Sequence, residues 1–434
     1  MRQLNILAVA GFAFSVSVLA QTLEPKPNDP YFSKFQPIKA PKPSGLILKP
    51  GDRLAICGDS ITEQRMYSRV METYLTACAP ELGVTVRHYG WSGEVAPGFL
   101  ARMTNDCLRF HPTIATTCYG MNDHGYRPYE DSIGEKYRVA SAAIVRAFKA
   151  SGARVIQGSP GSIGKIPPWS RFTNSTMEHL NLNLCELRNI GIAIADAEHV
   201  GFADVFWPML TSDFSARQKY GSSFAVPGKD GVHPGWAGQV VMAYAFLKSF
   251  GMDGQIGTFT VDLARNQGIA SEGHEILNFK DGELQIKSRR YPFCAAGGDL
   301  SKDDNIRAGM ALVPFNQELN RLMLVVKNAG AKDCKVTWGS QTKIYSPEQL
   351  SKGVNLAEDF LVNPFSNAFA NVDAAVAAKQ AYETRQIKDL FHGPEGKIDS
   401  DSTGVLTEKV RGPLAAAIKS AFVPVTHSIK IEPQ

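Results

Sequence analysis

The chain has 434 residues, of which 44% are hydrophobic and 20% are charged, and its formal net charge is +4. This is the composition of a globular protein long enough for two or three domains, and it excludes disordered, collagen-like and membrane-bundle chains. Lys and Arg form no run, so the sequence has no electrostatic footprint for a nucleic-acid partner.

The first 20 residues have the pattern of a secretory signal peptide. Arg2 precedes an apolar run from Leu4 to Leu19, and the small residue Ala20 follows it. We expect cleavage after Ala20, which gives a secreted or periplasmic protein without an integral membrane span. An uncleaved anchor helix is the alternative, but the run is at the short limit for spanning a bilayer and no basic flank follows it.

The seven cysteines lie far apart and form no CxxC pair or Cys/His ligand cluster, so the sequence predicts no structural zinc site. Export would permit disulfides. An odd number of cysteines leaves at least one thiol unpaired unless a bond joins two chains.

The proline-rich segment over 21–50 is a lead-in that we expect to lie over the surface. From residue 51 to residue 250, short apolar strands alternate with amphipathic helices, which is typical of a parallel sheet with crossover helices. Strands are expected at 53–57, 84–89, 113–119 and 154–157, and helices at 61–82, 137–150, 176–189 and 236–250.

After residue 256 the pattern changes to short strands separated by turn residues. Strand candidates occupy 258–263, 275–279, 283–286, 322–326 and 335–338, and a helical stretch covers 371–386. We expect a β-rich accessory region over 256–350 and a helical tail over 351–434, with packing of the tail against the α/β domain as one possibility.

Ser60 lies at the predicted turn between the first strand and the first helix, and the sequence Asp230-Gly231-Val232-His233 follows about 170 residues later. A serine hydroxyl becomes an effective nucleophile when a histidine takes its proton and a carboxylate orients that histidine. Acyl transfer also needs donors for the developing oxyanion, which the backbone of Gly93 and the amide of Asn122 can supply.

Four sequence blocks resemble those of the SGNH (GDSL-like) hydrolase family. They are GDSIT at 58–62, GWSGE at 90–94, GMND at 120–123 and DGVHP at 230–234, in the family's order across residues 51–250. The resemblance implies a flavodoxin-like three-layer α/β/α domain with a parallel sheet, and it implies no catalytic metal or organic cofactor. Glu94 stands where Asp is more usual in the family.

The resemblance also implies a Ser-His-Asp triad and an oxyanion hole. Ser60 would be the nucleophile, His233 the general base and then the general acid, and Asp230 the residue that orients His233. The backbone N–H groups of Ser60 and Gly93 and the side-chain amide of Asn122 would form the oxyanion hole.

Most of these residues also have a purely structural interpretation. Ser60 can be a helix N-cap, Gly93 a turn glycine with positive φ, and Asn122 an Asx-turn residue. His233 can be a loop histidine before a helix, although its three-residue spacing from Asp230 favours a pair. Asp59 we interpret as structural, with a carboxylate that binds nearby backbone N–H groups.

Three further residues are candidates for contacts with a substrate. Trp91 and Trp169 fall on predicted loops near the carboxyl ends of strands, where open α/β sheets bind ligands. They can form a platform for a sugar or acyl group, and ordinary packing is an equal alternative. His124 lies two residues after Asn122 and can line the same cleft.

The sequence therefore predicts a secreted carboxylic ester hydrolase that acts through an acyl-enzyme intermediate and removes acetyl groups from carbohydrate. The carbohydrate part rests on analogy at the level of the fold. A lipase or thioesterase for longer acyl chains is one alternative, and a carbohydrate-binding or envelope module with a vestigial hydrolase domain is another. The expected partner is a small acyl ester or a polysaccharide, and the sequence leaves the oligomeric state open.

Overall fold

The structure is a computed structural model that describes residues 22–172 and 174–434. The predicted signal peptide over residues 1–20 lies outside the described residues. Among the described helices, none has the length and apolar character needed to cross a membrane.

Five parallel strands form the central sheet in the order β2-β1-β3-β4-β5, the order of flavodoxin-like folds. The strands are β1 (Arg53–Gly58), β2 (Thr85–Gly90), β3 (Ile114–Cys118), β4 (Arg154–Gly158) and β5 (Gly201–Ala203). The first four are the predicted strands. The fifth was not predicted, because an element of three residues is too short to show a strand periodicity.

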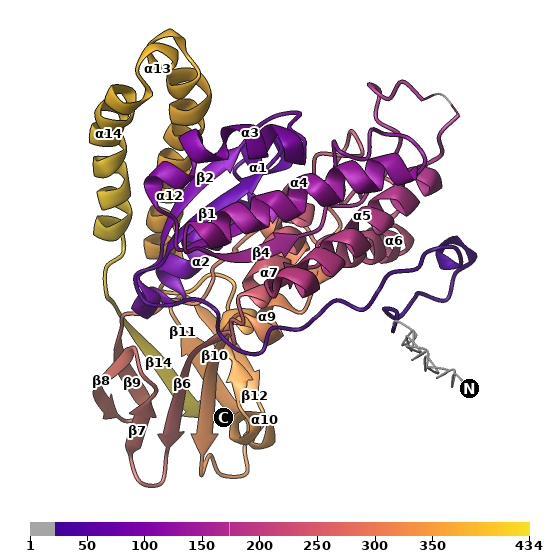
Figure 1. The fold of residues 1–434 in the computed structure, drawn as a ribbon. Coiled ribbons are helices and arrows are strands. Elements are labelled where there is room, and N and C mark those ends of the chain that lie inside the picture. The colour runs from indigo at the N-terminus through magenta and orange to yellow at the C-terminus, as the bar shows by residue number, and fades with distance from the viewer. Residues whose placement is uncertain (1–21, 173) are drawn as a thin grey trace, which may run out of the picture.

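Alternate residues of β1 face opposite layers of helices, as the pleat of a strand requires. Leu54 and Ile56 lie in one buried apolar cluster, and Ala55 and Cys57 lie in a second cluster. The helices over the first face are α2 (Tyr67–Ala77) and α7 (Trp236–Ser249), and those over the second are α3 (Ala96–Asp106), α4 (Asp131–Ala150) and the second half of α5 (Met177–Glu198). The predicted three-layer α/β/α domain is thereby confirmed (Figure 1).

The single helix predicted over 61–82 is divided into two. Helix α1 (Ser60–Glu63) ends after one turn, and α2 begins at Tyr67. Arg65 between them has a φ of +57°, a left-handed conformation that cannot continue a right-handed helix. The apolar stripe that suggested a single helix is real, but most of it belongs to α2 alone.

The proline-rich lead-in is anchored in the α/β domain and does not merely lie over its surface. Phe32 and Phe35 are fully buried, and Phe32 meets Trp207 edge to face with ring centroids 5.7 Å apart. The backbone N–H of Ile38 donates to the side chain of Asn189 at 3.1 Å. Two aromatic anchors and a hydrogen bond to α5 thus fix the course of this segment.

The region after residue 256 contains two further sheets, with strand orders β13-β10-β6-β7 and β12-β11-β14-β9-β8. Their strands are β6 (Gln255–Asp262), β7 (Gln267–Ala270), β8 (His274–Lys280), β9 (Glu283–Ser288), β10 (Arg321–Lys327), β11 (Cys334–Trp338), β12 (Gln341–Tyr345), β13 (Val354–Asn355) and β14 (Val425–Pro433). The short helices α8 (Ile306–Leu312), α9 (Phe315–Glu318) and α10 (Pro347–Lys352) connect them.

The predicted helical tail over 351–434 is present, but it is not helical to its end. Its helices are α11 (Leu356–Asp359), α12 (Ser366–Arg385), a π-helical turn (Gln386–Phe391), α13 (Pro394–Ile398) and α14 (Ser400–Ala421). The chain then forms β14, which pairs antiparallel with both β11 and β9 in the accessory sheet. The tail and the β-rich region are therefore interleaved, and α12 packs on α2 and β2 of the α/β domain.

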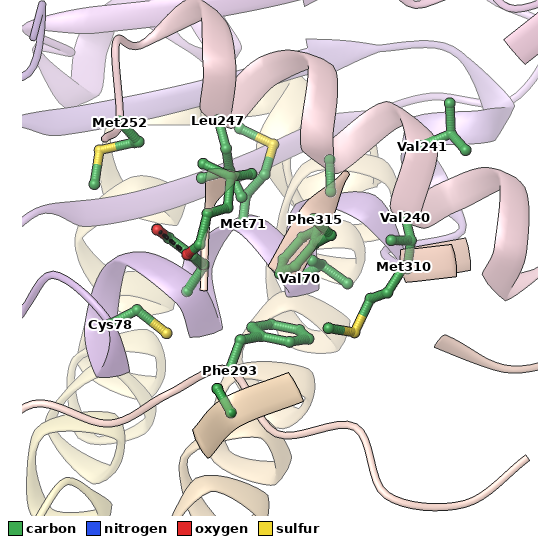
Figure 2. Close-up of a cluster of buried hydrophobic side chains, with 14 of the residues drawn as sticks. Val70, Met71, Cys78, Val240, Val241, Leu247, Met252, Phe293, Met310 and Phe315 are labelled. Atoms are coloured by element: carbon green, nitrogen blue, oxygen red, sulfur yellow. Dashed lines mark hydrogen bonds between the residues drawn. The ribbon is translucent and has the colours of Figure 1, made fainter. Parts of the chain in front are cut away.

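A hydrophobic cluster joins the α/β domain to the accessory region. Val70 and Met71 from α2 lie with Phe293, Met310 and Phe315, which all follow residue 256 (Figure 2). The accessory region thus shares a core with the α/β domain and is not a separate body on a linker.

A buried chain of hydrogen bonds connects the two accessory sheets. The indole Nε1–H of Trp338 can only donate, and it donates to His427 Nδ1 at 3.1 Å. Because Nδ1 accepts, the proton of the neutral His427 ring is on Nε2, which donates to Ser288 Oγ at 2.9 Å. Ser288 then donates to His274 Nδ1 (2.8 Å), and His274 Nε2 donates to the carbonyl of Ile256 (3.0 Å). Burial lowers the pKa of His427 to about 3 and also lowers the pKa of His274, so both rings stay neutral.

When folding depresses the pKa of a histidine, the unfolded state binds a proton more readily than the folded state. The stability that the neutral ring contributes is therefore fully present above the unfolded pKa and is lost as the pH falls below it. We therefore expect the advantage of the wild type over His427→Gln in free energy of unfolding to shrink by about 1.4 kcal/mol per pH unit below about pH 6.5. Urea unfolding of both proteins at pH 7.5 and pH 5.0 measures this change. A difference between the two proteins that is the same at both pH values would contradict it.

Candidate active site

Ser60 directly follows the turn after β1 and opens helix α1. The N-cap of this helix is Asp59, whose carboxylate accepts the N–H of Ile61 at 2.9 Å. The interpretation of Ser60 as the cap is therefore wrong, and the structural interpretation of Asp59 is confirmed. The Ser60 hydroxyl is free for another partner, and its backbone N–H, in the first turn of a helix, has no intrahelical acceptor.

That partner is His233, which lies in the loop before α7. Ser60 Oγ lies 2.8 Å from His233 Nε2, and His233 Nδ1 lies 2.7 Å from Asp230 Oδ2. A proton on Nδ1 satisfies the carboxylate and leaves Nε2 unprotonated, so that it can accept the serine hydroxyl. The fold thus joins the three residues into one chain of hydrogen bonds.

The carboxylate of Asp230 is held by its own turn. Its Oδ1 accepts the N–H groups of Val232 (2.9 Å) and His233 (2.8 Å). Partial burial opposes ionisation, but these N–H groups and the imidazole outweigh it, and the pKa of Asp230 lies below its ordinary value. Asp230 is therefore a carboxylate at neutral pH and keeps His233 in the required tautomer.

The turn Trp91–Glu94, at the end of β2, lies beside the turn that leads to Ser60. The N–H of Trp91 donates to the carbonyl of Gly58 at 3.0 Å, and the N–H of Glu94 closes the turn on Trp91 at 3.2 Å. Gly93 has a φ of +71°, which glycine adopts without strain, so it is a turn glycine as one interpretation required. Within the described part of the chain, its N–H donates to no protein acceptor, which leaves it available to a ligand.

A buried ion pair holds the far end of this turn. Arg102 from α3 donates to both carboxylate oxygens of Glu94, at 2.6 and 2.7 Å, and the hydroxyl of Tyr119 donates to the same group at 3.0 Å. Such bidentate pairs fix the geometry of both partners. Arg102 was not predicted from the sequence, because its spacing from Glu94 does not distinguish it from a surface residue of an amphipathic helix.

Asn122 follows β3 and is oriented at both ends of its amide. Its Nδ2 donates to the carbonyl of Glu94 at 3.0 Å, and its Oδ1 accepts the hydroxyl of Tyr126 at 3.1 Å. An amide nitrogen carries two protons, so one N–H remains for a further acceptor. The neighbouring Asp123 braces the loop, because its carboxylate accepts the N–H groups of Gly120 and Ala96, both at 2.9 Å, and burial raises its pKa to about 6.

Trp169 is the predicted substrate-contact residue that reaches the site. Its ring centroid lies 5.7 Å from that of His233 and 6.0 Å from that of Tyr126, and 43% of the residue is exposed. The exposed ring of Trp169 therefore lies beside His233 and is accessible to a ligand.

The other two candidates are placed differently. Trp91 is half-buried and packs between the guanidinium of Arg102, 5.0 Å from its ring centroid, and the ring of His392 in the tail at 4.9 Å. His124 is fully buried, its Nδ1 is bonded to the carbonyl of Met121, and burial lowers its pKa to about 4. The expectation that His124 lines the cleft is therefore corrected, because its side chain has no exposed surface.

Residues 22–172 and 174–434 contain no group of three or more His, Cys, Asp or Glu side chains arranged to hold a metal ion. All seven cysteines are free thiols, and six of them are buried. Ser60, His233 and Asp230 are arranged so that a serine hydroxyl can be activated, and Gly93 and Asn122 have N–H groups to offer to an oxygen that gains negative charge.

The sequence profile of the GDSL-like Lipase/Acylhydrolase family matches residues 56–241. The matched part of the chain is similar to a GDSL-like lipase/acylhydrolase domain, and it contains Ser60, Asp230 and His233. A comparison with curated proteins gave no match.

Three solved structures are among those that match this chain. A gut microbial diltiazem-metabolizing enzyme is 21% identical with a TM-score of 0.73, and the match covers 90% of this chain and all of that chain. An acetylxylan esterase from Geobacillus stearothermophilus is 21% identical with a TM-score of 0.38, over 47% of this chain and 96% of its own. A GDSL-like lipase assigned in Parabacteroides merdae is 20% identical with a TM-score of 0.39, over 48% and 99%. The first of these shares the fold of the accessory region and the tail as well.

The geometry of Asn122 predicts a selective effect on turnover. In ester hydrolysis, Asn122→Ala is expected to lower kcat by about two to three orders of magnitude with little change in KM, because the amide serves the oxyanion more than the ground-state carbonyl. Tyr126→Phe, which removes the hydroxyl bond to Asn122 Oδ1 and keeps the Asn122 amide, is the control and should lose far less. Steady-state kinetics checks both, and a raised KM with unchanged kcat would make Asn122 a binding residue.

Proposed function

We propose that this protein is a serine ester hydrolase with Ser60, His233 and Asp230 as its catalytic triad. The observation that carries the proposal is the unbroken chain from Ser60 Oγ to His233 (2.8 Å) and on to Asp230 (2.7 Å). The match of residues 56–241 to an acylhydrolase family supports it.

The reaction follows from these positions. His233 Nε2 takes the hydroxyl proton as Ser60 Oγ bonds to the acyl carbon, and the carbonyl oxygen becomes an oxyanion. The N–H groups of Ser60 and Gly93 and the amide of Asn122 receive that oxygen. His233 then gives the proton to the leaving alcohol, the ester C–O bond breaks, and an acyl-serine remains. Water, deprotonated by the same imidazole, hydrolyses the acyl-serine and restores the enzyme.

Ser60→Ala is expected to abolish hydrolysis of p-nitrophenyl acetate, while the unfolding midpoint stays within a few degrees, because the cap of helix α1 is Asp59 and is retained. The wild type should prefer acetate over butyrate and octanoate esters. Initial rates with the three esters and a thermal melt of both proteins test this. Substantial activity in Ser60→Ala would remove Ser60 from its role, and a preference for octanoate would favour a lipase or thioesterase.

For the substrate, we propose small acyl groups such as acetyl on carbohydrate. The support is the exposed face of Trp169 beside His233, since aromatic faces in binding sites offer flat apolar surface on which a sugar ring can stack. A module that only binds carbohydrate is disfavoured, because an unbroken chain of hydrogen bonds from Ser60 to Asp230 has no role in binding alone.

Trp169→Ala is expected to raise KM for an acetylated xylooligosaccharide by about tenfold, which corresponds to about 1.4 kcal/mol of lost contact. The KM for p-nitrophenyl acetate should change little, because that substrate has no sugar to stack. Acetate release measured with both substrates checks the expectation. Phe172→Ala, which alters another exposed aromatic residue of the same loop, is the control. Equal effects of Trp169→Ala on both substrates would count against a sugar platform.

We propose, from the pattern of residues 1–20 alone, that the protein is secreted or periplasmic. Mass spectrometry of the exported chain would then find Gln21 at its N-terminus, and retention of residues 1–20 would overturn this part.

A further inference from the structure

The tail reaches the turn Trp91–Glu94 through its π-helical turn, Gln386–Phe391. Lys388 Nζ lies 5.5 Å from the centroid of the Trp91 ring. The ring of His392, just after the π-helical turn, has its centroid 4.9 Å from that of Trp91. A π-helical turn within a helical segment is rare and is often found at functional sites. Residues about 300 positions apart in the sequence are thereby brought into contact at the candidate oxyanion donors.

One ionic link runs from the tail to the start of the turn. Lys388 Nζ donates to Glu63 Oε1 at 2.6 Å, and Glu63 Oε2 accepts the backbone N–H of Ser92. Glu63 is the last residue of helix α1, which Ser60 opens. One carboxylate therefore connects the nucleophile helix, the turn and the tail.

This link depends on the close approach of α1 to the end of β2. A Cβ atom on Gly90 would lie 2.2 Å from the backbone nitrogen of Glu63, so only glycine allows the helix to lie there. The side chains of Lys388 and Glu63 are 25% and 19% exposed. Water is thus partly excluded from this pair, which strengthens its electrostatic attraction relative to a surface pair.

A second link runs from the tail to the end of the turn. His392 Nε2 lies 2.7 Å from Asp106 Oδ2, which in turn lies 3.3 Å from Arg102 Nη1. Arg102 holds both carboxylate oxygens of Glu94. The tail is therefore connected to the residues on either side of Gly93.

We propose that Lys388 and Glu63 are positioning residues for the oxyanion turn, so that the C-terminal tail is a working part of the active site. The inference rests on the proposed function, in which the N–H of Gly93 donates to the oxyanion and has to be held in place. Stabilisation of an oxyanion requires donors that are already in place, and a displacement of about 1 Å can cost about a hundredfold in rate. Without Lys388, the Glu63 carboxylate loses the partner that holds it against Ser92.

The test is a comparison of Lys388→Met with a matched control. Asp373→Asn breaks the ion pair with Arg69, which also joins the tail to the α/β domain, has similarly exposed side chains (24% and 28%) and makes no contact with the turn. For p-nitrophenyl acetate, Lys388→Met is expected to lower kcat by about 10- to 100-fold with KM within about threefold of wild type. Asp373→Asn should keep the wild-type kcat, and Lys388→Arg should restore most of the loss.

A double-mutant cycle asks whether Lys388 acts through Glu63. The kcat of the Glu63→Ala, Lys388→Met double variant should be no lower than that of Glu63→Ala alone, because the second change removes a partner that has already lost its function. A double variant whose loss is the product of the two single losses would overturn the proposed link.

Hydrogen exchange of the peptide that contains Ser92 and Gly93 gives a readout that needs no turnover. Lys388→Met should exchange this peptide faster than wild type, and Asp373→Asn should not. If the wild type hydrolyses no ester, the proposed function is overturned. Hydrogen exchange of the Ser92–Gly93 peptide would still report in that case whether Lys388 and Glu63 hold the turn in place. Equal exchange in both variants, or faster exchange with unchanged kcat, would overturn the positioning role.

Discussion

The parallel pairing of β1 with β2 and β3 is the constraint on which the site depends. In its register Gly58 lies opposite Gly90 and opposite Cys118, so the carboxyl ends of three strands stand level. After these ends, the chain forms the turn that leads to Ser60, the turn Trp91–Glu94 and the loop that contains Asn122. A shift of register by one residue would move one of these loops by about 3.3 Å along the sheet, more than a hydrogen bond tolerates.

This constraint explains why so much could be predicted from sequence. Strands β1 to β4 are apolar runs bounded by turn residues, and each of the first three blocks follows its strand directly, so local pattern places them at one edge. The pairing of Asp230 with His233 is also local, because three residues separate them. The features predicted here from patterns within about ten residues are present in the structure.

Features that depend on contacts between residues distant in the sequence could not be predicted from local sequence patterns. The helix breaks at Arg65, two residues after the close approach of Glu63 to Gly90, and the apolar stripe gives no sign of this break. The burial of His124 depends on what packs around it in three dimensions. The links from Lys388 to Glu63 and from His392 to Asp106 join residues about 300 positions apart, and an isolated Lys or His in a helical tail has no distinguishing pattern.

The position of β14 has a consequence for how the protein is made. The last strand of the chain lies between β11 and β9, and the N–H of Gln434 still donates to the carbonyl of Asp333 at 2.8 Å. The accessory sheet therefore cannot close until residues 425–433 have left the ribosome, and until then β9 and β11 are unprotected edges. Proteolytic removal of residues 425–433 would expose the same edges of β9 and β11 in the folded molecule.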